Sequence, residues 1–302
     1  MRPKTRNEVP RNLVKYYYLA FEGRRTEHRY FSALENRRVF SENIFLARMF
    51  KGPAELSDSH PLQVESLLEE YVGYRQGGPY SVNLFINDVL DCLDCTGQIQ
   101  LDEDGKQASI YFKKLKNSLV SGGISDGVKL LDEEKALTAA TDFFKKECGK
   151  DTVIIDLNKY KNITGDDFSK DVYCIIVDRD KGNFFPDQVE KMIRLCSENN
   201  FRLVITNPYF ELWLLLHFDV SKETIMNNME KRSGLKLELS KYSSINTKNR
   251  IPNEFTDKLE RALANIKDYA QDIAVLKELP SEKTIGSNIG LLMNELMGRD
   301  RS

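Results

Sequence analysis

The hydrophobic pattern of the chain consists of short apolar runs, typical of strands, that alternate with segments of helical spacing. A half-exposed strand would alternate apolar and polar residues, so the unbroken apolar run 172–177 predicts a strand buried on both faces. Further strands are predicted at 15–21, 42–49, 151–157 and 201–206. Helices are predicted at 26–38, 61–74, 186–200 and 208–218. This alternation predicts an α/β fold in which helices cover a mostly parallel sheet.

A change in character between residues 73 and 150 predicts an inserted, mostly helical subdomain. The segment contains Gly-Gly-Pro, an acidic turn and a flexible SGGISDG stretch, with helical spacing near 81–93, 108–120 and 132–147. We expect the core of the fold to be built from 13–72 and 151–220. The remaining residues, 221–302, are expected to be helical, with helical spacing over 254–279 and a last helix over 284–297.

The composition indicates a globular chain that can build a large core, because 41% of its 302 residues are hydrophobic. No segment approaches about 18 consecutive apolar residues, and the first residues lack the apolar core of a signal peptide. The five cysteines are an odd and scattered set, which suits a reducing compartment. We therefore expect a cytoplasmic protein without a membrane partner.

The charge of the chain is unevenly distributed. A net charge of −2 excludes a protein that coats nucleic acid through bulk positive charge, but it permits a local basic surface. Residues 1–30 carry eight Lys and Arg residues against three Glu residues, a local balance of +5. This end of the chain is therefore the expected basic surface.

Carboxylates follow three of the predicted strands at the point where each strand ends. Asp178 and Asp180 end the central strand, Glu22 and Gly23 end the first, and Glu211 lies in the first turn of the helix after a third. In open α/β sheets, ligands bind outside the carboxyl ends of the strands. Carboxylate oxygens are hard ligands, so the pattern predicts a site for Mg²⁺ or Mn²⁺. The alternative is that the two aspartates only cap backbone amides of a turn.

Three motifs carry a resemblance to a known family. They are FEGRRTEHRYF at 21–31, VDRD at 177–180 and NPYFELWLLLHF at 207–218, and a closing stretch at 280–297 adds to them. Together they have the layout of a Toprim domain, and the chain resembles the RloB-like family (the AbiL second-gene type) over 1–50 and 170–300. The resemblance implies a Toprim-like fold and a metal-dependent nuclease of antiphage defence by abortive infection, commonly encoded beside an ATPase.

The candidate catalytic residues are Glu22, Asp178, Asp180 and Glu211. Asp178 and Asp180 are expected to hold a divalent metal, and Glu22 either binds the metal too or serves as general base. Glu211 is expected to be a ligand or to support one. Glu27 either holds a second metal or, as a first-turn glutamate, stabilises its own helix.

The candidate nucleic-acid-binding residues are Arg24, Arg25 and Arg29, which could contact phosphates; the alternative is a solvated basic turn. The expected substrate is DNA or RNA, tRNA included, and a homo-oligomer is left open. His217 and Trp213, in the apolar helix after the third strand, are expected in the core.

A topoisomerase or a primase is disfavoured, because neither a domain with a nucleophilic tyrosine nor a template-binding module is evident in the sequence. The alternative function of another class is a non-catalytic sensor or inhibitor that binds a cation or a basic partner on the same scaffold.

Overall fold

The computed structural model describes residues 16–22, 26–41, 43–48, 61–101, 106–158, 171–180, 182, 184–243 and 253–299. The described residues fall into two compact units. One unit contains the described residues within 67–172 together with Tyr16 and Tyr17; the other contains those within 18–49, 57–66 and 173–302. The two units are described separately below.

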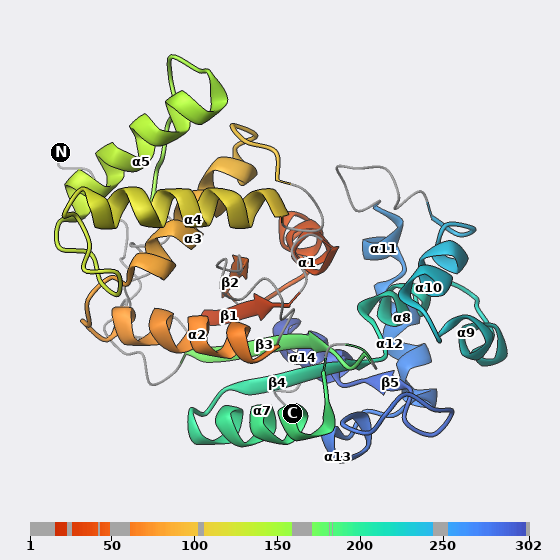
Figure 1. The fold of residues 1–302 in the computed structure, drawn as a ribbon. Coiled ribbons are helices and arrows are strands. Elements are labelled where there is room, and N and C mark those ends of the chain that lie inside the picture. The colour runs from red at the N-terminus through yellow and green to blue at the C-terminus, as the bar shows by residue number, and fades with distance from the viewer. Residues whose placement is uncertain are drawn as a thin grey trace, which may run out of the picture. The chain divides into compact units, whose positions relative to one another are not determined.

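The second unit is built on a five-stranded sheet whose order is β2-β1-β3-β4-β5 (Figure 1). The strands are β1 (Tyr16–Phe21), β2 (Asn43–Arg48), β3 (Val172–Asp178), β4 (Arg202–Asn207) and β5 (Gly286–Ser287). β3 and β4 are parallel, whereas β4 and the short β5 are antiparallel. Residues 173–178 of β3 are all buried, which confirms the prediction of a strand covered on both faces.

The helices confirm the predicted α/β class. Those of the second unit are α1 (Thr26–Asn36), α7 (Pro186–Glu198), α8 (Phe210–Leu215), α9 (Lys222–Asn228), α10 (Arg232–Leu239), α11 (Glu254–Asp257), α12 (Leu259–Asn265), the 3₁₀ helix η4 (Ile266–Asp268), α13 (Ile273–Leu276) and α14 (Ile289–Leu296). Pro186 starts α7, where its fixed φ suits the first helical position. The sheet is mostly parallel and strands alternate with helices along the chain.

The first unit is helical, and its helices lie close to the predicted positions. They are the main part of α2 (Pro61–Arg75), then α3 (Val82–Cys95), α4 (Lys106–Ser121) and α5 (Glu133–Cys148). Ser81 and Asp132 accept hydrogen bonds from the first-turn amides of α3 and α5, and Gly149 ends α5 with a positive φ of 61°. None of the described helices is long and apolar enough to cross a membrane.

The prediction of a strand at 151–157 is wrong. The main chain there is paired with a side chain instead of a strand: the Gln98 amide accepts from Ile154 N at 2.7 Å and donates to Ile154 O at 2.6 Å. Val153 and Leu157 are buried but Ile154 is exposed. An apolar run shows which residues prefer burial, but not whether a neighbouring strand is available to pair with them.

The C-terminal helices are shorter than the helical spacing suggests. Residues 254–279 form α11, α12, η4 and α13 instead of a single helix; Asp272, whose side chain accepts from Ala274 N at 2.9 Å, begins a separate helix, α13. The last helix starts at Ile289, because Gly286 and Ser287 form β5. A Cβ at Gly286 would clash with the main chain of Ala270, so this close approach requires glycine.

Asn288 extends the sheet with its side chain. Its Oδ1 accepts from Ile205 N at 2.8 Å and its Nδ2 donates to Leu203 O at 3.0 Å. The amide thus satisfies two main-chain groups of β4 as a neighbouring strand would. Asn288 therefore fixes α14 against the edge of the sheet.

Replacing Asn288 with Ala is expected to lower the free energy of unfolding by about 1–3 kcal/mol, because the buried amide of Ile205 and carbonyl of Leu203 lose their partners. Denaturant unfolding measures the loss. Leu291→Ala, at an exposed position of the same helix, is the control and should change stability by less than about 0.5 kcal/mol. Equal stability of the two variants would contradict this role of the amide.

Candidate functional site

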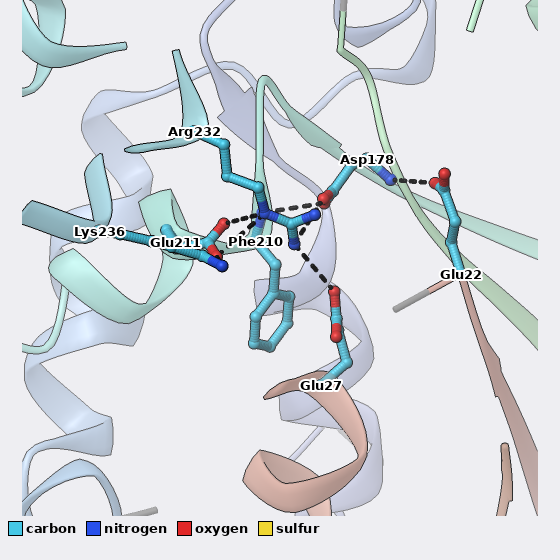
Figure 2. Close-up of polar contacts among 7 residues, drawn as sticks. All are labelled: Glu22, Glu27, Asp178, Phe210, Glu211, Arg232 and Lys236. Atoms are coloured by element: carbon cyan, nitrogen blue, oxygen red, sulfur yellow. Dashed lines mark hydrogen bonds and ion pairs between the residues drawn. The ribbon is translucent and has the colours of Figure 1, made fainter. Parts of the chain in front are cut away.

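The exits of β1 and β3 lie side by side. Glu22 N donates to Ile176 O at 3.0 Å, and the Glu22 carboxylate accepts from Asp178 N at 3.2 Å. Two acidic residues separated by 156 positions therefore meet at the carboxyl edge of the sheet, as parallel neighbouring strands favour. Figure 2 shows Glu22 on the opposite side of Asp178 from the remaining carboxylates.

Asp178 is tied to the start of α8 as well. Its Oδ1 accepts from Phe210 N at 2.8 Å, so the carboxylate satisfies an amide at the first residue of the helix. Asp178 therefore caps a backbone amide, but this amide belongs to the distant helix α8 and not to the turn after β3 that the alternative named. Because only one oxygen is used in this way, the other remains directed at the site.

A guanidinium stands among the carboxylates (Figure 2). Arg232, the first residue of α10, donates from Nε to both oxygens of Glu211 at 3.0 Å. Its NH2 lies 3.2 Å from Asp178 Oδ2 and 3.7 Å from Glu27 Oε1. Lys236, one turn later, lies 3.8 Å from Glu211. Elements α1, β3, α8 and α10 therefore each contribute a charged side chain to one cluster.

The three carboxylates around Arg232 are buried: Glu27 is 3% exposed, Asp178 8% and Glu211 2%. Burial raises the pKa of Asp178 well above its ordinary value; Arg232 opposes this shift, and Glu27, Glu22 and Glu211 add to it. Burial likewise raises the pKa of Glu27, against the lowering effect of Arg232. Burial and the neighbouring carboxylates therefore favour the protonated form of Asp178 and Glu27, in spite of the nearby guanidinium.

The pKa of the Arg232 guanidinium is also raised, but by its neighbours and not by burial. Burial by itself lowers its pKa, but the carboxylates of Asp178, Glu211 and Glu27 outweigh that effect and raise the pKa above the ordinary value. Arg232 is thus a permanent cation in this cluster. The Tyr209 ring lies beside it, 5.8 Å from the guanidinium carbon to the ring centroid.

Asp180 lies on the rim of the site rather than around Arg232. Its carboxylate accepts from Gly182 N at 2.8 Å, in the turn after β3. Asp180 and Asp178 both raise the pKa of Tyr209, after the larger effect of burial, which places Asp180 near that ring. The intervening Arg179 is 1% exposed and donates to the carbonyls of Lys277, Asp180 and Phe184, so it holds this turn in place.

The structure brings together Glu22, Asp178, Glu27 and Glu211 of the predicted site. Arg24 and Arg25 lie outside the described residues, and Arg29 lies half-buried on α1. Sequence reasoning missed Arg232 and Lys236. A signal for them existed: they are four residues apart, on one helical face, in a segment whose apolar residues Leu235 and Leu239 follow the same spacing.

The donor set agrees in kind with a hard divalent cation, since it consists of carboxylate oxygens. Within the part of the chain that the structure describes, however, no three His, Cys, Asp or Glu side chains are arranged to hold a metal ion. Arg232 contacts the oxygens of all three buried carboxylates. The donor chemistry therefore suits a divalent cation, whereas in this structure an arginine contacts these oxygens.

The fold and the cluster define the class of protein: an α/β protein with acidic side chains from separate strands and helices at the carboxyl edge of a mostly parallel sheet. The chain belongs to the RloB-like protein family, a Toprim-related family, whose model matches residues 103–296. Neither a curated protein nor a solved structure matches the chain. The matched residues include Asp178, Glu211 and Arg232. The match begins in the helical segment, earlier than the resemblance at 170–300 suggested, and it does not include residues 1–50, which the resemblance also covered and which contain Glu22 and Glu27.

His217 lies in the core, as predicted. Its Nδ1 is 3.0 Å from Trp213 O and its Nε2 is 3.1 Å from the Tyr30 hydroxyl, so the neutral ring donates to the carbonyl and accepts from the hydroxyl. Trp213 and His217 are both 0% exposed. Burial lowers the pKa of His217 to about 4. The ring is therefore a neutral link between α1 and α8.

The pKa of His217 predicts a loss of stability on acidification. In the unfolded chain the imidazole binds a proton below pH about 6.5. In the folded chain it stays neutral down to pH about 4. Between these values this residue should remove about 3 kcal/mol from the free energy of unfolding. Urea unfolding of the wild type and His217→Gln at pH 7 and pH 4.5 isolates the effect, since other groups titrate in both proteins. Tyr30→Phe, which keeps the imidazole, is the control. A stability difference between wild type and His217→Gln that stays constant with pH would contradict the assignment.

Proposed function

We propose that this RloB-like protein is a divalent-metal-dependent phosphodiesterase that cleaves nucleic acid in antiphage defence by abortive infection. One observation carries the proposal: three buried carboxylates from α1, β3 and α8 converge on a single guanidinium at the carboxyl edge of the sheet. Like charges are costly to bury together unless a cation compensates them. A site that gathers them is consistent with a role that requires a cation.

The proposed roles follow from the contacts of each residue. Glu27, Asp178 and Glu211 would hold a Mg²⁺ or Mn²⁺ ion, which supplies neutralisation of the charge that develops on a phosphodiester during hydrolysis. Glu22, held against the Asp178 amide, fixes the strand exit and is the proposed acceptor of a proton from the attacking water. Asp180, on the rim, is proposed as a further ligand.

The substrate class follows from charge. The basic balance of residues 1–30 and the candidate residues Arg24, Arg25 and Arg29 suit the phosphates of DNA or RNA, tRNA included. A nuclease that acts on host nucleic acid has to be held inactive until infection. We therefore propose that a partner, such as an ATPase encoded alongside, controls the activity.

One observation favours a second candidate. Arg232 and Lys236 already pair with the buried carboxylates, as in an ion cluster that only stabilises a fold. The protein would then be a non-catalytic sensor or inhibitor on a Toprim-like scaffold. The two candidates differ in whether Asp178 is needed for a chemical step.

Asp178→Asn is expected to lower Mg²⁺- or Mn²⁺-dependent cleavage by at least about 100-fold, because a metal ligand supplies several kcal/mol of transition-state stabilisation. The assay uses plasmid, single-stranded DNA and total tRNA, with and without any ATPase encoded alongside. Asp187→Asn, at an exposed position in the first turn of α7, is the matched control and should retain activity.

Circular dichroism and thermal unfolding establish whether the Asp178→Asn chain is folded. Equal cleavage by the Asp178→Asn and wild-type proteins would overturn the nuclease. Loss of cleavage in the folded variant, with binding of the substrate retained, is the expected outcome and separates the enzyme from the non-catalytic binder.

The proposed metal also predicts a shift in stability. A cation that binds the folded chain alone raises the apparent stability by about 2.7 kcal/mol at 100 times its dissociation constant. Mn²⁺ should therefore raise the melting temperature of the wild type but not that of Asp178→Asn. A differential scanning calorimetry series with Mn²⁺, and with K⁺ at matched ionic strength, measures this difference. An equal shift in both proteins would place metal binding elsewhere.

A further inference from the structure

Helix α10 presents two cations to the carboxylate cluster from one face. Arg232 and Lys236 are four residues apart, a spacing that puts side chains on the same side of a helix. Both approach Glu211, but only Arg232 reaches Asp178 and Glu27 as well. The two residues therefore provide a matched pair: a cation that contacts the whole cluster and a cation that contacts one member of it.

The guanidinium occupies the oxygens that a metal would need. Nε is bonded to both oxygens of Glu211, and NH2 lies within 4 Å of one oxygen each of Asp178 and Glu27. Asp178 Oδ1 is already used by Phe210 N. A divalent cation on these carboxylates would share their oxygens with Arg232, and two cations at such short range repel each other.

The solvent exposure of the two sides of the cluster differs. The Arg232 side chain is 39% exposed, whereas the side chains of Glu27, Asp178 and Glu211 are 5%, 10% and 2% exposed. The carboxylates are fixed inside α1, β3 and α8. Arg232, at the first residue of α10, has a path into solvent, so the cation rather than the carboxylates is the component that can exchange.

We propose that Arg232 is a positioning residue that holds the three carboxylates together in the metal-free protein, and that a divalent cation binds by displacing its guanidinium. The inference rests on the proposed function, because it assigns the metal to the same carboxylates. Arg232 then sets the metal affinity of the site: the stronger its hold on Glu27 and Asp178, the weaker the apparent binding of the metal.

The test is isothermal titration calorimetry of the full chain with Mn²⁺ alone. Arg232→Gln should bind Mn²⁺ at least about tenfold more tightly than the wild type, because the competing cation is gone. Arg232→Lys, which keeps the charge but loses the forked geometry, should give a smaller shift in the same direction. Lys236→Gln removes a cation that contacts only Glu211 and should give a smaller gain than Arg232→Gln. Lys191→Gln, at an exposed position of α7, is the control and should leave the affinity unchanged.

A second measurement reports competition directly. Arg232→Ala leaves room for free guanidinium ion, and millimolar guanidinium chloride should weaken Mn²⁺ binding to this variant. The same concentration of NaCl should weaken it less, because sodium lacks the forked donors that match a carboxylate. A purely structural role of Arg232 would produce no difference between the two salts.

The outcomes separate the two proposals. Unchanged or weaker Mn²⁺ affinity in folded Arg232→Gln, with normal binding by the wild type, overturns the inference and leaves the proposed function intact. Absence of Mn²⁺ binding in the wild type and in every variant overturns both. If Arg232→Gln does not fold, the Arg232→Lys titration decides: tighter binding supports the exchange, and unchanged or weaker binding overturns it.

Discussion

The structure around the site depends on the balance of charge between Arg232 and three buried carboxylates. Glu27, Asp178 and Glu211 come from an N-terminal helix, a central strand and a later helix, and none of them could be buried beside the others without a nearby cation. Since that cation is supplied by α10, the N-terminal and C-terminal parts of the second unit depend on each other. Arg232, which lies late in the sequence, contacts all three carboxylates and offsets part of the cost of burying them together.

Asp178 is the residue through which most of these elements are connected. Its main-chain amide donates to Glu22, one carboxylate oxygen accepts from Phe210 and the other pairs with Arg232. Each contact has a different partner element, so the side chain cannot rotate without losing at least one of them. These contacts hold the strand exit in place, and Arg179, buried beside it, adds hydrogen bonds to three carbonyls.

The sequence predicts the strands and their exits well where burial on both faces removes the alternation of apolar and polar residues, as in β3. It fails at 151–157, where the Gln98 side chain and not a neighbouring strand pairs with the main chain of Ile154, and at Gly286, where strand pairing interrupts helical spacing. In both cases the main-chain partner is distant in sequence, so no local pattern contains it. The RloB-like motifs at 177–180 and 207–218 mark positions that the structure places at one edge of the sheet.

The sequence predicts the part of the candidate site that lies at strand ends, but not the part that depends on helix packing. Glu22 and Asp178 follow strands, and the topology of a parallel sheet brings strand ends together. Arg232 follows no strand, and its role depends on the packing of α10 beside α8, which the spacing of Leu235 and Leu239 indicates only as an amphipathic helix.

The side chain of Asn288 has a further effect on β4, which the short outer strand β5 covers only in part. By bonding to the amide of Ile205 and the carbonyl of Leu203, it occupies the positions through which a foreign strand would add to β4, while β5 covers the next two residues. An uncovered strand edge is a template for edge-to-edge aggregation. A single carboxamide therefore covers the part of β4 that the two-residue strand β5 does not reach, so this stretch of β4 offers no free amide or carbonyl at Ile205 and Leu203 to an added strand.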